Sequence, residues 1–384
     1  MYKRITIILA SFLMLATLRS ASVDRPTPTP RPRNFHAGAV YVMTNQVNNA
    51  VAVFRRSAHG TLTSAGEFPT GGSGDPVAQP GDPPTDPLAS QGSLILGEDN
   101  EFLFAVNAGS NQISVLRIEG DGLTIADIVD SGGVRPISLT LHENFLYVLN
   151  EGATPNITGF TVNDDGTLTP LAGSTQPLIG GTAADPAEVD FNPDGTLLVV
   201  TEKMGNRLDT YTIDENGLPS VPIDNPSNGM TPFGFAFNNG GTLIVSEAFG
   251  GAPNQAAVSS YNAPETGILS VVSGSIPNFQ TASCWVVIPN NGKSAFVSNT
   301  GSGTISSYSI GDDGTLTLIN ATAADLGPMS APRDTALSIN SRFLYVQIGG
   351  GTAVASFSVG RDGALTMIDT DGGLPFGAQG IAAK

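Results

Sequence analysis

The sequence predicts an all-β protein in which seven four-stranded antiparallel blades form a closed ring, a seven-bladed β-propeller. Three observations support this prediction. A unit of strand, turn, strand, tight turn and strand recurs along the chain. The interval between copies suits one four-stranded blade. A strand-like run near residue 380 has no blade of its own and is suited to closing the ring.

The repeated unit is clearest between Phe102 and Thr124. Apolar runs at 102–106 and 113–118 flank the turn 107–111, and Gly120-Asp121-Gly122 leads into a third strand. The pattern occurs in seven copies: Val40–Ala65, Phe102–Thr124, Phe145–Leu171, Thr196–Val221, Thr242–Val272, Ser294–Ile319 and Phe343–Ile368.

The spacing of the copies identifies the architecture. After the first interval, the residues at the first turn of each copy lie 43 to 53 residues apart, at Asn45, Asn107, Asn150, Thr201, Ser246, Asn299 and Gln347. A blade of four strands usually needs ~40–50 residues. The first interval, of 62 residues, is longer because it contains a Pro/Gly-rich insertion at 69–92. On loop-length grounds this insertion is either a mobile ornament or a flap over the central face.

A short apolar run precedes six of the copies and is predicted to be the innermost strand of each blade: Ser93–Leu96, Ile137–Leu141, Val189–Phe191, Phe233–Phe237, Trp285–Ile288 and Thr335–Ile339. The first copy lacks such a run. We expect residues 376–383 to supply it, which would close the ring and leave no free sheet edge.

Composition limits the function classes. The chain has 384 residues and a formal net charge of −17, which argues against nucleic acid and anionic membranes as partners. The single cysteine, Cys284, excludes an intrachain disulfide and is interpreted as a packing residue. A monomer without a cofactor is expected.

The N-terminal residues resemble a secretory signal. Lys3 and Arg4 precede an apolar segment at 5–18 that is too short to span a bilayer comfortably. We expect a signal peptide at 1–22, a Pro-rich linker at 23–38 and the propeller at 39–384. The expected location is secreted, extracellular or periplasmic, with no membrane insertion after signal cleavage; a retained anchor is the alternative.

In a propeller, the loops before each innermost strand and after each second strand gather on one face. This geometry predicts a ligand-binding set of amides, carboxylates and an arginine: Gln91, Asn107, Arg135, Asn150, Glu151, Glu247, Gln280 and Asn299. Arginine suits a carboxylate or phosphate ligand. The alternative for the asparagines is turn formation, and for the glutamates loop bracing or solvation.

The three histidines lie away from this face, so histidine-based catalysis and histidine-ligated metal sites are not expected. The Asp-Gly pairs lack the ligand spacing of calcium loops and are interpreted as hairpin turns. We expect no metal site; a divalent cation held by channel carboxylates is a third, less favoured alternative.

The stretches Asn192–Glu202, Ala331–Asp334 and Ser341–Val346 resemble the repeat of the seven-bladed lactonase family, which includes propeller-type 6-phosphogluconolactonases and carboxymuconate cyclases. Residues 246–251, 280–287 and 299–306 are similar to those of secreted bacterial members. The resemblance covers essentially the whole chain after the leader.

The resemblance implies two catalytic residues. Arg333 matches the arginine of the family's last blade, and Glu202 matches the glutamate after the second strand of blade 4. The family's Gly-Pro-Arg-His at the start of blade 4 is replaced by Asp185–Glu188, and its Pro-His before blade 3 by Pro136-Ile137.

Two functions follow from this comparison. One is a secreted lactonase-like propeller that hydrolyses or forms a small anionic sugar-acid or aromatic-acid lactone. In it, Arg333 holds the anionic group, Glu202 activates water or shuttles a proton, and Asn107, Asn150 and Asn299 orient hydroxyls. The other is a non-catalytic extracellular propeller that binds carbohydrate or protein.

Overall fold

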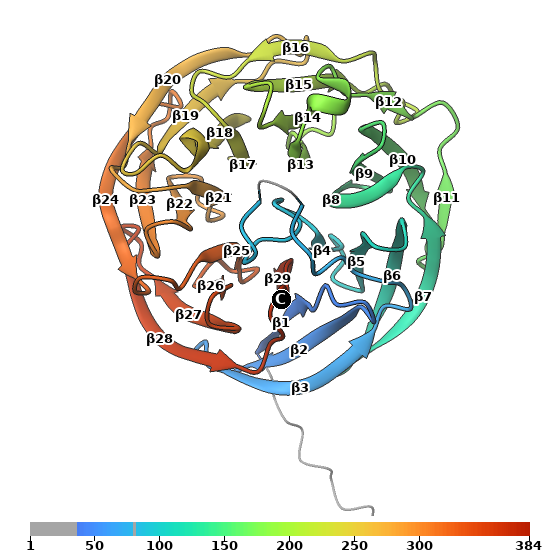
Figure 1. Cartoon of the computed structure of the whole chain (residues 1–384), viewed down its shortest axis with the longest axis horizontal. Coiled ribbons are helices and arrows are strands. Elements are labelled where there is room, and N and C mark those ends of the chain that lie inside the picture. Colours follow the sequence, from blue (N-terminus) through green and yellow to red (C-terminus); the bar gives the residue numbers. More distant parts are fainter. Residues whose placement is uncertain (1–36, 80–81) are drawn as a thin grey trace, which may run out of the picture. The chain divides into compact units, whose positions relative to one another are not determined.

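The computed structural model describes residues 37–79 and 82–384. In this part of the chain, seven antiparallel sheets are arranged around a common centre (Figure 1). The predicted seven-bladed propeller is confirmed, including the use of a C-terminal strand in blade 1.

In the first three blades the strands follow one another from the centre of the ring outward. Blade 1 contains β29 (Ile381–Ala383), β1 (Gly38–Met43), β2 (Ala50–Arg56) and β3 (Leu62–Pro69). Blade 2 contains β4 (Leu94–Leu96), β5 (Phe102–Asn107), β6 (Gln112–Glu119) and β7 (Gly122–Asp130). Blade 3 contains β8 (Val134–His142), β9 (Phe145–Gly152), β10 (Asn156–Val162) and an outer edge divided into β11 (Leu168–Pro170) and β12 (Gln176–Pro177).

The other four blades follow the same order. Blade 4 contains β13 (Pro186–Phe191), β14 (Leu197–Glu202), β15 (Arg207–Thr212) and β16 (Ile223–Pro226). Blade 5 contains β17 (Pro232–Phe237), β18 (Thr242–Glu247), β19 (Ala257–Asn262) and β20 (Ser270–Pro277). Blade 6 contains β21 (Ser283–Val287), β22 (Ser294–Asn299), β23 (Thr304–Ile310) and β24 (Leu316–Asp325). Blade 7 contains β25 (Pro332–Leu337), β26 (Phe343–Ile348), β27 (Ala353–Val359) and β28 (Leu365–Gly372). Two 3₁₀ turns lie in loops, η1 (Gly181–Ala183) and η2 (Phe249–Gly251).

The ring closes through pairing of β29 with β1. Tyr41 lies opposite Ala382, and the register places Val42 opposite Ile381. The guanidinium of Arg56 adds two hydrogen bonds to the carbonyl oxygen of Lys384, at 3.2 and 3.1 Å. Residues from the two ends of the propeller sequence therefore form one sheet.

The innermost strands of blades 3 to 7 begin earlier than the sequence predicts, because each has a β-bulge near its start. In four of these blades the bulge includes a proline, which has no N–H for the ladder. The residue just before the bulged segment has a positive φ in all five blades: Arg135, Asp185, Thr231, Ala282 and Ala331. This repeated backbone feature brings those five residues to the central face.

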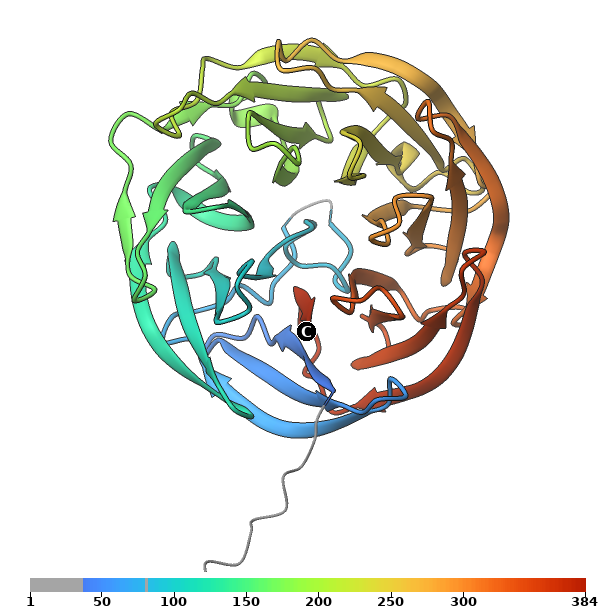
Figure 2. The ribbon, with the colours of Figure 1, turned by 180° about the vertical axis from the view of Figure 1, so that it is seen from behind.

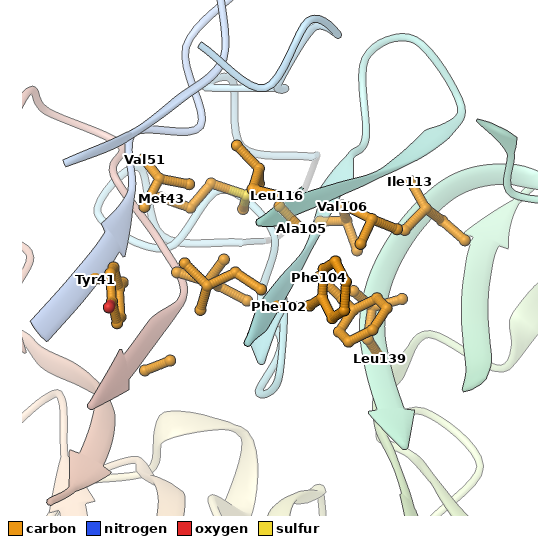
Figure 3. Packing of buried hydrophobic residues seen from close by; sticks show 14 of the residues in the cluster. Tyr41, Met43, Val51, Phe102, Phe104, Ala105, Val106, Ile113, Leu116 and Leu139 are labelled. Carbon is orange, nitrogen blue, oxygen red and sulfur yellow. The ribbon is translucent and has the colours of Figure 1, made fainter. Parts of the chain in front are cut away.

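The core lies between neighbouring blades. Figure 3 shows the cluster between blades 1, 2 and 3, which includes Tyr41 of β1, Phe102 and Phe104 of β5, and Leu139 of β8. These side chains are buried because the alternating residues of each strand face the two adjacent sheets.

The described part of the segment between β3 and β4, residues 70–79 and 82–93, includes loops that lie over the middle of the ring in both views (Figures 1 and 2). Residues 86–91 contact several blades at once. Their backbone carbonyls accept hydrogen bonds from Arg135 (to Pro87, 2.7 Å), Lys203 (to Ala89, 3.0 Å) and Trp285 (to Ser90, 2.9 Å). We call residues 86–91 the plug. The plug therefore covers the central face, as the second interpretation of the insertion expects.

The predicted signal peptide and almost all of the predicted linker lie outside the described residues. Within the described ranges, no helix has the length and apolar character needed to cross a membrane.

Candidate functional site

The polar residue that ends the second strand in several blades is buried and binds neighbouring loops. Asn107 is fully buried at the end of β5. Its Oδ1 accepts hydrogen bonds from Asn49 Nδ2 (3.0 Å) and Thr70 Oγ1 (2.7 Å). Its Nδ2 donates to Ser114 Oγ at 2.7 Å. Asn107 thus ties blade 2 to the loops of blade 1.

Asn299 and Asn150 have similar contacts. Asn299 Oδ1 accepts from Asn278 Nδ2 (3.0 Å) and Ser283 Oγ (2.6 Å). Asn150 Nδ2 donates to the carbonyl of Ser131 at 3.2 Å. None of the three asparagines lines the pocket described below. Their contacts are those of loop bracing, and a ligand-orienting role stays a prediction.

Glu202 and Glu247 occupy the same strand position in blades 4 and 5. Both carboxylates are fully buried. Glu202 accepts the N–H of Gly180 at 2.9 and 3.1 Å, and Glu247 accepts the N–H of Gly229 at 2.9 Å. A Cβ on either glycine would collide with the carboxylate. These glutamates therefore brace the loop that joins their blade to the preceding one.

The neighbours of Glu202 are also buried. Arg207 on β15 lies opposite Glu202, with its Nε 3.6 Å from Glu202 Oε2. Asp209, two residues further along β15, also interacts with the Glu202 carboxylate. Burial and the adjacent Glu202 raise the pKa of the Asp209 carboxyl. If Glu202 and Asp209 share one proton, the protonated carboxyl can donate a hydrogen bond to the other. Two ionised carboxylates cannot do this.

Arg333 lies on β25 and is almost completely buried. Its Nε and Nη1 have no hydrogen-bond partner among the described residues. Burial lowers the pKa of Arg333, while Asp86 of the plug and the adjacent Asp334 raise it. Burial also raises the pKa of Asp86 to about 6 and of Asp334 to about 7. Arg333 and Glu202 are thus separate buried sites, in blades 7 and 4.

Gln91 ends the plug and reaches the opposite side of the ring. Its Nε2 donates to the carbonyls of Phe235 (3.0 Å) and Val286 (3.1 Å). Its Oε1 accepts the N–H of Val286 at 3.0 Å. These contacts connect blade 2 with blades 5 and 6, so both ends of the Gln91 amide are used inside the protein.

A cavity of about 530 Å³ opens beside the plug and is the first lobe of the candidate site. Among the predicted ligand-binding residues, Arg135 and Glu151 line this lobe together. Arg135 donates to Glu151 through Nη1 and to Asp75 Oδ2 through Nε at 3.0 Å. With the contact of Nη2 to the Pro87 carbonyl, each of the three guanidinium nitrogens donates one hydrogen bond to the protein.

A second cavity, of about 310 Å³, shares Asp82, Asp185 and Met204 with the first. We call it the second lobe. Lys203 Nζ contacts Asp185 Oδ1 at 3.0 Å and lies 5.2 Å from the centre of the Phe233 ring. Cys284 lies on the wall, and burial raises the pKa of its thiol, as expected of a packing residue.

Asp82, at the junction of the lobes, has a perturbed carboxyl. Burial raises the pKa of Asp82. The positive charges of Lys203 and Arg135 partly offset this rise, and the negative charge of Asp185 adds to it. Sequence reasoning did not select Asp82, Asp185 or Lys203 as site residues. Asp185 could have been found from its place before the bulge proline of blade 4; Asp82 lies in the insertion, which follows no repeat.

The last predicted residue, Gln280, lies on the rim of blade 6. Its Oε1 accepts from Thr304 Oγ1 at 2.7 Å, and it lines neither lobe. In the portion of the chain covered by the structure, no three His, Cys, Asp or Glu residues are placed to hold a metal ion.

Comparisons with known proteins agree with the fold. The family model described as "Lactonase, 7-bladed beta-propeller" matches residues 21–177, 99–278 and 257–377. The 6-phosphogluconolactonase of Yersinia pestis (strain Pestoides F) is 30% identical over 127 residues, which cover 32% of this chain and 35% of that protein. The match thus spans about a third of the length of this curated relative.

Solved structures match over more of the chain, with low sequence identity. A candidate 6-phosphogluconolactonase from Bacteroides fragilis NCTC 9343 has a TM-score of 0.66 at 18% identity, covering 92% of this chain and 100% of that one. The periplasmic gluconolactonase of Pseudomonas aeruginosa has a TM-score of 0.66 at 15% identity, covering 89% and 98%. These similarities show a shared fold.

Proposed function

The chain belongs to the seven-bladed β-propeller lactonase family, and we propose that it hydrolyses the lactone of a small hydroxy acid in the two-lobed pocket. The observation that supports the proposal is the place of Asp82 between the lobes, beside Asp185 and Lys203. A half-buried carboxyl with a raised pKa in a cleft is a candidate general acid–base group.

The proposed reaction uses Asp82 twice. The Asp82 carboxylate takes a proton from water while the water oxygen bonds to the lactone carbonyl carbon. The tetrahedral intermediate then collapses, the ring C–O bond breaks, and the leaving oxygen takes the proton back from Asp82. Lys203, at the lobe wall, would stabilise the oxyanion. The names of the Yersinia and Pseudomonas relatives are consistent with this reaction type.

The earlier assignment of chemistry to Glu202 and Arg333 stays a prediction, and one set of variants separates the two. Asp82→Asn is expected to lower kcat/KM about 100-fold on a lactone panel, since general acid–base catalysis contributes about that much. Glu265→Gln, in an exposed hairpin turn, is the matched control and is expected to leave turnover unchanged.

Two outcomes would contradict the assignment of catalysis to Asp82. If Glu202→Gln or Arg333→Ala lowers kcat in folded protein while Asp82→Asn does not, the chemistry belongs to the buried pair. If pure wild-type protein opens no lactone, the enzymatic proposal is wrong.

A non-catalytic carbohydrate-binding propeller is the second candidate. The observation that favours it is the pairing of both cations in the pocket: Arg135 with Glu151 and Asp75, and Lys203 with Asp185. Cations already neutralised by the protein stabilise developing negative charge less well. Saturable sugar binding without lactone turnover would support this candidate.

The proposal also includes two properties of the protein: it is exported to the cell exterior or the periplasm, and it is a monomer. Their support is the basic and apolar N-terminal pattern and the net charge of −17. N-terminal sequencing of the mature protein is expected to find Val23 first. Light scattering is expected to give the mass of one chain.

A further inference from the structure

The two lobes of the pocket differ in chemistry although they share one junction. Asp82, Asp185 and Met204 line both. Met204 is one of the more exposed large apolar side chains, with 71% of its surface accessible. A ligand that fills the whole pocket must therefore pass this junction and meet two different environments.

The first lobe has a larger share of polar surface than the second. It contains the paired Arg135 and Glu151 together with Thr182 and Gln79. Such side chains can exchange hydrogen bonds with the hydroxyls of a sugar ring. The charges are internally matched, because Arg135 donates to Glu151, Asp75 and the Pro87 carbonyl.

The second lobe is mainly apolar at its walls. Phe233, Ala248, Ala282 and Cys284 contribute to it and belong to one buried hydrophobic cluster. The charged groups there are directed to protein partners. Lys203 binds Asp185 and the plug, and Asp86 Oδ1 accepts from Gln379 Nε2 at 2.6 Å.

Charge adds a constraint on the ligand. The acidic lining residues Asp82, Asp86, Asp185 and Glu151 outnumber the basic ones, Arg135 and Lys203. A phosphate or carboxylate entering here would meet an excess of negative charge and no uncommitted cation among the lining residues. An uncharged ligand avoids this cost.

We propose that the pocket takes an uncharged ligand of two parts, with a hydroxylated ring in the first lobe and an apolar group of about phenyl size in the second. The proposal rests on the proposed function for the location of the site. It departs from the expectation of an anionic ligand, which depended on Arg333. It identifies the substrate class as a neutral lactone with an apolar substituent; a glycoside with the same two parts serves as a non-reacting analogue for binding.

Calorimetry with matched sugars tests the inference on the intact protein. Phenyl β-D-glucoside is expected to bind about tenfold or more tightly than methyl β-D-glucoside, from burial of the phenyl group. Glucose 6-phosphate is expected to bind no more tightly than glucose. Ala248→Leu, which fills the second lobe, should abolish the phenyl advantage and leave methyl glucoside binding unchanged.

Two further variants keep the test decisive. Ala172→Leu, at an exposed turn of blade 3, is the control and should preserve the phenyl advantage. If Ala248→Leu does not fold, Met204→Ala should reduce the phenyl advantage, since Met204 is exposed at the junction and carries little folding risk.

Several results would overturn the inference: equal binding of the phenyl and methyl glucosides, no binding of either at millimolar concentration, or tighter binding of the phosphorylated sugar. A measurement of lactone turnover distinguishes failure of the two-part-ligand inference from failure of the proposed hydrolase function. Turnover that depends on Asp82 without a phenyl advantage rejects the two-part ligand alone. A phenyl advantage without turnover of any lactone rejects the hydrolase alone.

Discussion

Gln91 and Val286 exchange two hydrogen bonds across the centre of the ring, Nε2 to the carbonyl at 3.1 Å and N–H to Oε1 at 3.0 Å. The pairing mimics a strand partner, because the side-chain amide offers the same donor and acceptor as a peptide group. A segment with no repeat pattern therefore acts as a central support for blades of the opposite half.

Replacing Gln91 with alanine is expected to destabilise the protein by about 2–4 kcal/mol, since it leaves the Phe235 and Val286 carbonyls without their partner. The free energy of unfolding from denaturant titration measures the effect. Gln280→Ala, on the rim of blade 6, serves as the control and should cost much less. An equal loss in both variants would contradict a special role for Gln91.

Gly180→Ala is expected to destabilise blade 4 by about 2 kcal/mol or more, because the new Cβ would meet the Glu202 carboxylate that binds the Gly180 N–H. The same reasoning applies to Gly229 and Glu247 in blade 5. Gly372→Ala is the matched control, since a Cβ there meets nothing within 4 Å. Thermal melting compares the variants; a Gly180→Ala melting temperature equal to wild type would show that the brace is dispensable.

Stability is expected to fall as pH rises from about 4 to 7, because burial holds the pKa of Asp334 at about 7, above that of an unfolded aspartate. The folded state binds more protons than the unfolded state in this window, so deprotonation favours unfolding. The Asp334 carboxyl is half ionised near pH 7, and the loss from this group levels off about one pH unit higher.

Asp334→Asn tests this pH dependence, because asparagine stays neutral and can still accept the Gly380 N–H, which now lies 2.7 Å from Oδ2. The variant is expected to melt higher than wild type at pH 8 and to differ less at pH 5. Calorimetric scans at both values, with Glu265→Gln as reference, measure it. A wild-type melting temperature that rises steadily to pH 8 with no change in Asp334→Asn would contradict the assignment.

Most of the fold could be predicted because the same pattern of strands and turns recurs along the chain. The alternation of apolar residues and the turn before each third strand recur in every blade, so errors at one copy are corrected by the others. The bulges were not predicted: Pro136 and its counterparts alter the start of each inner strand through the missing N–H, a local effect that an apolar run does not report.

The site was less predictable because it depends on residues that break the repeat. Arg135 and Glu151 were found from their loop positions and do line the pocket. Asp82 belongs to the insertion, whose path depends on contacts made far away in sequence. Glu202 and Asn107 sit at equivalent strand ends, and only the packing of the preceding loop reveals that both are braces.

The pairing of β29 with β1 also bears on how the protein can be made. Val42 and Ile381 are neighbours in the sheet and more than three hundred residues apart in sequence. During synthesis, the inner edge of blade 1 therefore stays unpaired while the other six blades are produced. An edge exposed for that time is a template for pairing with other chains. Pairing of β29 with β1 covers this edge.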